Sequence, residues 1–60
     1  MSRHLHRIEL TRESFPTRIC VSVEPRSITY PPARFATDAD AEIAAARLRD
    51  TTGFPIIDRR

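Results

Sequence analysis

The 60-residue sequence contains no lysine, asparagine, glutamine or tryptophan, and only one cysteine and one glycine. One cysteine excludes an internal disulfide, and the absence of a CxxC or CxxH pair excludes the usual ligands of structural zinc. One glycine excludes a glycine-rich phosphate loop. Because so short a chain buries only about 60% of the surface that its unfolded form exposes, association with another protein or with itself is the expected source of extra stability.

Long apolar runs are also missing. The first ten residues, "MSRHLHRIEL", carry charges where a signal peptide has its hydrophobic region, and no later run is long enough to span a membrane. The single cysteine is typical of a reducing compartment. These features predict a cytoplasmic protein that does not enter a membrane.

The ten basic residues are all arginine, and the formal net charge is +2. Arginine without lysine has two explanations. One is selection for bidentate contacts to phosphate or carboxylate groups. The other is a GC-rich bacterial or phage genome, which also accounts for the missing asparagine and glutamine and the abundant alanine. The arginine bias alone is therefore weak support for nucleic-acid binding.

The N-terminal half predicts a hairpin of two strands. Apolar residues in "RHLHRIELTR" indicate an imperfect strand over residues 3–11. In "TRICVSVEP", three β-branched residues alternate with polar ones, which predicts a strand over 17–24 that ends before Pro25. The inward side chains of this second strand, Ile19, Val21 and Val23, need a cover, and the reverse face is expected to be open: Arg18, Cys20, Ser22 and Glu24.

The C-terminal half predicts a proline-rich loop, a helix and a short strand. The loop spans 25–36 and has room for a strand at Ser27–Tyr30. Thr37 and Asp40 have the spacing of a helix N-cap and Gly53 is a typical helix stop, so we expect a helix over 38–51. Residues 54–58 predict a strand that Pro55 restricts to a sheet edge. The predicted fold is a single small α+β domain in the order β, β, α, β, with one helix on a small mixed sheet.

The predicted helix has one broad face of small and apolar residues, including Ala44 and Leu48, which we expect to cover the second strand. Ile43 does not belong to that face, since at 100° per residue it lies roughly 140° from Leu48. It is either an ordinary exposed isoleucine or part of a surface that a partner covers.

The favoured function is that of a non-enzymatic protein-binding module, such as an accessory subunit, an assembly component or an inhibitor. Tyrosine and arginine are frequent among interface hot spots, and prolines reduce the entropy lost when a loop docks. Alternatively, the aromatic residues of this loop fold back over the thin core. The candidate protein-binding residues are Arg18, Arg26, Tyr30, Arg34, Phe35 and Ile43.

Nucleic-acid binding is the main alternative. Residues 1–34 contain more arginines than glutamates, whereas residues 35–58 are acidic on balance. A basic half with aromatic residues nearby has the composition needed to follow a phosphate backbone and stack on bases. The candidate residues for this function are Arg7, Arg12, Arg18, Arg26 and Arg34.

A metal or thiol site is a third and weaker alternative. His4 and His6 point the same way on a strand, but a metal site needs further ligands. Cys20 next to Arg18 is a conceivable nucleophile with a histidine as its base, although a half-buried filler is the commoner role of such a cysteine. We assign no catalytic residue, no metal site and no cofactor.

Overall fold

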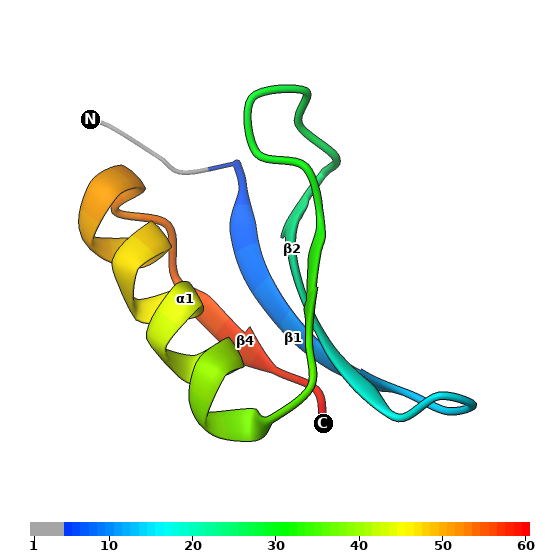
Figure 1. The fold of residues 1–60 in the computed structure, drawn as a ribbon. Helices are drawn as coiled ribbons and strands as arrows, with labels where there is room; N and C mark the ends of the chain where they lie inside the picture. Colours follow the sequence, from blue (N-terminus) through cyan, green and yellow to red (C-terminus); the bar gives the residue numbers. More distant parts are fainter. Residues whose placement is uncertain (1–4) are drawn as a thin grey trace.

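The computed structural model describes residues 5–60 of the chain, which form a small α+β domain with one helix on a four-stranded mixed sheet (Figure 1). The order of strands across the sheet is β3-β2-β1-β4. The predicted fold class is confirmed. The elements are β1 (Arg7–Glu13), β2 (Arg18–Glu24), β3 (Ala33–Phe35), α1 (Asp38–Thr52) and β4 (Ile56–Asp58).

Strands β1 and β2 form the predicted antiparallel hairpin. Their register places Ile8 opposite Val23 and Leu10 opposite Val21, so the alternating apolar residues of both strands reach the same face. The first strand begins at Arg7 rather than at residue 3, and residues 3 and 4 lie outside the described part of the chain. The hairpin projects beyond the end of α1 (Figure 1).

The third strand lies later in the loop than the sequence predicts. Residues 27–30 form bends, and β3 follows the two prolines Pro31 and Pro32 and pairs antiparallel with β2. The predicted loop over 25–36 therefore does contain a short strand, but at Ala33–Phe35 and not at Ser27–Tyr30. Prolines fix an extended backbone but lack an N–H donor, so regular pairing with β2 begins only after them.

Helix α1 starts and stops at the predicted signals. The Thr37 hydroxyl oxygen accepts a hydrogen bond of 3.2 Å from the backbone N–H of Asp40. Gly53 has a φ of 78°, a left-handed conformation that glycine adopts without steric cost, and its N–H donates to the Arg49 carbonyl oxygen. The helix ends within one residue of its predicted end.

Strand β4 closes the far edge of the sheet by pairing parallel with β1, with Ile56 next to Ile8. The Pro55 carbonyl oxygen accepts a hydrogen bond from the Ile8 N–H at 2.8 Å. Pro55 itself lies just before the strand, where its missing donor costs no ladder bond. The strand is shorter than the predicted 54–58, but its edge position agrees with the sequence.

The core lies between the sheet and α1. It consists of Ile8, Leu10, Ile19, Val21, Val23, Ala41 and Ala45. The expectation that Ala44 and Leu48 form the main contact needs correction, because Ala41 and Ala45 are the buried helix residues and the other two lie half-buried at the side. Two alanines on the buried side let the helix approach the strands closely.

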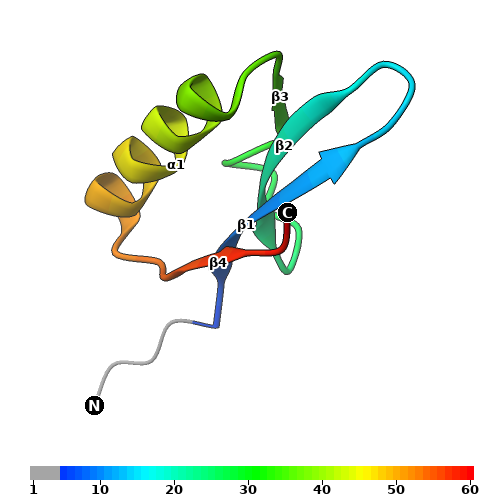
Figure 2. The same cartoon turned by 90° about the horizontal axis from the view of Figure 1, so that it is seen from below.

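One helix is not wide enough for this sheet. A helix is about 10–12 Å across, whereas four strands spaced about 4.8 Å apart are wider. Helix α1 packs against β1, β2 and β3, and Figure 2 shows it on one face of the sheet with no element on the other face. Within residues 5–60, no element covers the reverse face, and part of the inner face next to β3 is also left open.

Candidate functional site

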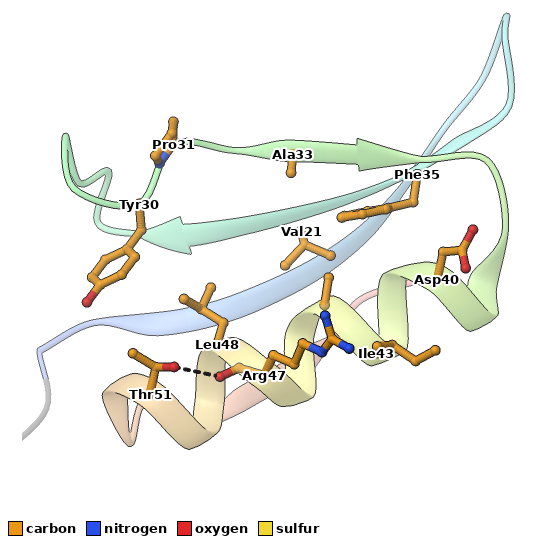
Figure 3. A pocket seen from close by; sticks show the side chains of 11 residues that line it. Val21, Tyr30, Pro31, Ala33, Phe35, Asp40, Ile43, Arg47, Leu48 and Thr51 are labelled. Atoms are coloured by element: carbon orange, nitrogen blue, oxygen red, sulfur yellow. Dashed lines mark hydrogen bonds between the residues drawn. The ribbon is translucent and has the colours of Figure 1, made fainter.

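An open groove runs between α1 and the β3 side of the sheet, with a volume of about 650 Å³ (Figure 3). Its lining is mainly apolar. The helix side consists of Asp40, Ile43, Ala44, Arg47, Leu48 and Thr51. The sheet side consists of Val21, Ala33 and Phe35, with Tyr30 and Pro31 at one end.

Three of the predicted protein-binding residues meet in this groove: Tyr30, Phe35 and Ile43. The Tyr30 ring packs edge-on against Phe54 with ring centroids 6.2 Å apart, so its body belongs to the fold while it also forms one end of the groove. Phe35 reaches the groove from β3, and Ile43 reaches it from α1 with 54% of its surface exposed. The loop aromatics thus both pack on the core and border the groove, as the two alternatives for this loop allowed.

The other three predicted protein-binding residues lie elsewhere. Arg18 is at the hairpin end of β2 and donates a hydrogen bond to the Thr17 carbonyl oxygen, whereas Arg26 is in the loop at the opposite end of β2. Arg34 alternates with the groove residues of β3 and therefore points to the reverse face. The structure does not bring these arginines together with Tyr30, Phe35 and Ile43.

The arginines proposed for nucleic-acid binding are mostly paired with carboxylates. Arg7 binds Glu9, Arg12 lies 3.3 Å from Asp38, and Arg34 lies 2.7 Å from Glu13. The hydrogen bond that Arg34 donates to the Glu13 carboxylate, together with the negative charge of that carboxylate, raises the pKa of Arg34. Three of the five candidate arginines are thus already neutralised by carboxylates of the same chain.

The remaining two candidates, Arg18 and Arg26, have no ion pair with a described residue. They lie at opposite ends of β2, since Arg18 is its first residue and Arg26 comes two residues after its last. Two charges at opposite ends of a sheet, separated by neutralised arginines, do not form a continuous basic track.

No element of residues 5–60 covers the reverse face of the sheet, but the expectation that Cys20 is open there is wrong. Cys20 is only 8% exposed, and Glu9 is only 9% exposed between Arg7 and Arg59. The hydrogen bond from Arg7 and the charges of both arginines lower the pKa of Glu9, against the opposing effect of burial. An ion pair within β1 and a second one to the residue that follows β4 therefore satisfy the Glu9 carboxylate on this face.

The structure separates the described residues of the third hypothesis. His6 stacks on Phe54 with ring centroids 5.3 Å apart, and His4 lies outside the described residues. Cys20 pairs with Thr11, five positions along β1 from His6, which corresponds to roughly 16 Å. Among residues 5–60, no group of three or more potential metal ligands comes together.

Several residues of the groove are not predicted from the sequence, in particular Asp40, Arg47 and Leu48. The sequence pattern places Asp40 only in the helix cap and Leu48 only on the core face. The signal was present in the spacing of 40, 43, 44, 47, 48 and 51, which marks one side of a helix. Its significance depends on where the neighbouring strand ends, which the sequence does not show.

Known proteins add no family assignment, since no family model matches the chain and no curated protein or solved structure is significantly similar to it. In the described part of the chain, no helix has the length and apolar character required to cross a membrane.

Proposed function

We propose that this protein is a non-enzymatic protein-binding module that receives an apolar segment of another polypeptide in the groove between α1 and β3. The observation that carries the proposal is the meeting of Tyr30, Phe35 and Ile43 around one apolar, open surface. Such a module acts as an accessory subunit, an assembly component or an inhibitor. Aromatic anchors around an apolar centre are the usual composition of an interface core.

The shape of the groove favours a polypeptide over a small molecule. Sites for small ligands bury about 70–90% of the ligand surface inside a concave pocket. This groove is open along its length and is bordered by a helix on one side and a strand on the other (Figure 3). A helix or strand of a partner can lie along such a surface, whereas a small ligand would stay largely in water.

The composition supports a cytoplasmic setting and an origin in a GC-rich bacterium or its phage. The only cysteine is a buried, unpaired thiol in β2, which suits a reducing compartment. Nucleic-acid binding remains the alternative, and the ion pairs of Arg7, Arg12 and Arg34 weigh against it.

Site-specific photocrosslinking in cells tests this function. A photoreactive amino acid replaces Ile43 in the groove or, as a control, Ile57, which is exposed on the opposite face of the sheet. The proposal predicts a crosslinked protein band from position 43 that is absent at position 57. Crosslinks to nucleic acid, or no protein crosslink at position 43, would contradict it.

Two matched alanine variants show whether the groove itself is required. Ala44 lines the groove, whereas Ala46 is equally half-buried but lies 200° around the helix and does not line it. Ala44→Gln should abolish the crosslink from position 43, and Ala46→Gln should preserve it. Both substitutions have the same effect on helix propensity, so circular dichroism serves as a common control for folding.

A further inference from the structure

The groove side of α1 carries a short pattern of charge and apolar residues. Asp40, Ile43, Ala44 and Arg47 are spaced at i, i+3, i+4 and i+7 and line the groove together. A negative charge stands at the N-terminal end of this pattern and a positive charge at the other end, with a large and a small apolar residue between them. We call these four residues the α1 stripe.

Asp40 and Arg47 differ from the other charged residues of the helix. Asp38 and Glu42 both lie within 3.0 Å of Arg60, and Arg49 lies 3.6 Å from Asp50. Neither Asp40 nor Arg47 makes an ion pair with any residue in the described range 5–60. The stripe therefore presents two charges of opposite sign that no described part of the chain neutralises.

The α1 stripe is complementary to itself when it is reversed. If a second α1 lies antiparallel, centred between Ile43 and Ala44, then Asp40 of each copy meets Arg47 of the other. Ile43 of each copy then meets the small Ala44 of the other. A two-fold symmetric interface requires this reciprocity, in which residue i contacts residue j and residue j contacts residue i.

From this match we infer that the partner in the groove is a second copy of the chain, with the two α1 helices antiparallel. The inference rests on the proposed protein-binding function and names its partner. The dimer covers Ile43, which is 54% exposed in one copy, and gives Asp40 and Arg47 two reciprocal ion pairs. Ala44 allows the close approach of helix axes, about 8–10 Å, that packed helices adopt.

Charge exchange between Asp40 and Arg47 tests the dimer. Light scattering and sedimentation velocity measure the mass of the wild type over about two orders of magnitude of concentration. The wild type should be a dimer. Asp40→Arg and Arg47→Asp should each raise the dimer dissociation constant at least about tenfold, because like charges then oppose each other at both ends of the contact.

The two single variants should bind each other when they are mixed. In an equimolar mixture, both arginines of the Asp40→Arg chain face the two aspartates of the Arg47→Asp chain, so a heterodimer forms although neither variant dimerises alone. The double variant D40R/R47D should dimerise by itself, because it exchanges the signs of both partners. This rescue separates a direct ion pair from a general loss of folding.

The matched control is Arg49→Asp, which reverses an exposed charge that pairs only with its neighbour Asp50. Its dimer dissociation constant should equal that of the wild type. If circular dichroism shows that Asp40→Arg does not fold, Arg47→Asp and Ile43→Arg test the same contact, since both positions lie beyond the first turn of α1. Each should then give a folded monomer.

The outcomes distinguish this inference from the proposed function. A monomeric wild type whose groove position crosslinks to a different protein overturns the second copy as partner and leaves the protein-binding function standing. A dimer that is unchanged by both charge reversals uses another surface and also overturns the inference. A monomer without a groove crosslink contradicts both.

Discussion

The two flanks of helix α1 differ in how their charges are satisfied. On the flank towards the chain end, Arg60 reaches Asp38, Glu42 and Asp58, with distances of 2.6 to 3.0 Å. On the flank towards β3, the described chain offers Asp40 and Arg47 no ion pair, and Ile43 stands exposed above the groove. We call these the closed flank and the open flank.

This difference identifies the flank of α1 whose charges are paired within the chain and the flank whose charges are not. Both flanks belong to one helix of ordinary length with the same caps, so helix propensity does not explain the difference. On the closed flank, β4 and the residues after it return to the helix and supply its counter-charges. On the open flank, β3 is a three-residue edge strand, and among residues 5–60 no further strand lies beyond it. A partner on the open flank would supply the counter-charges that Arg60 supplies on the closed flank.

The largest predicted effect comes from the core that both flanks share. Ile8 is fully buried, and replacing it with alanine should cost about 2–5 kcal/mol. A domain of this size has about 3–9 kcal/mol in total, so Ile8→Ala should remove a large part of the stability at 25 °C. Ile43→Ala on the open flank should change monomer stability by less than about 0.5 kcal/mol. Urea unfolding of both variants measures the contrast, and equal losses would show that Ile43 belongs to the core.

A smaller effect on stability is expected when the ion pairs of the closed flank are removed. Arg60→Ala removes the guanidinium group that joins three carboxylates, so the midpoint of thermal unfolding should fall by a few degrees, less than for Ile8→Ala. Arg49→Ala, which loses only an exposed contact to Asp50, should leave the midpoint almost unchanged. Calorimetry at low and high salt measures both variants. Equal effects of the two would mean that the cluster around Arg60 adds nothing to stability.

The smallest effect is the pH dependence that Asp58 contributes on the closed flank. Hydrogen bonds and the positive charge of Arg60 lower the pKa of Asp58 to about 2, below its value of about 3.9 in the unfolded chain. This pair therefore stabilises the fold above about pH 4, and that contribution disappears as the pH falls from about 4 to about 2. Asp58→Asn should accordingly lose less stability than the wild type over this window in thermal melts. If the wild type and Asp58→Asn lost the same stability over this pH range, the pairing of Asp58 with Arg60 would be contradicted.

The sequence predicted the elements that short-range signals define. Alternation located β2, the spacing of Thr37 and Asp40 located the start of α1, and Gly53 located its end. These signals depend on steric and hydrogen-bonding preferences of residues close together in the chain. The strand at Ala33–Phe35 was missed because its three residues have little pattern of their own, and pairing with β2 decides their conformation.

The candidate site was predicted only in part for a related reason. Tyr30 and Phe35 were identified from residue type and their place in or beside the proline-rich loop, and Ile43 from its position around the predicted helix; the sequence contains all of this information. The ion pairs that neutralise Arg34 and Arg12 join residues far apart in the chain, so composition alone could not reveal them. The same holds for the groove, whose width follows from the position of one helix on four strands.

The position of β1 between β2 and β4 also bears on the order of folding. One side of β1 pairs with its hairpin neighbour, so Leu10 meets Val21 early, whereas the other side pairs with Ile56 only after the whole crossover has formed. Local contacts form faster than contacts across long loops. The β1–β2 hairpin and β4 should therefore behave as separate cooperative units, with amide protection in β4 appearing last during refolding and disappearing first during partial unfolding.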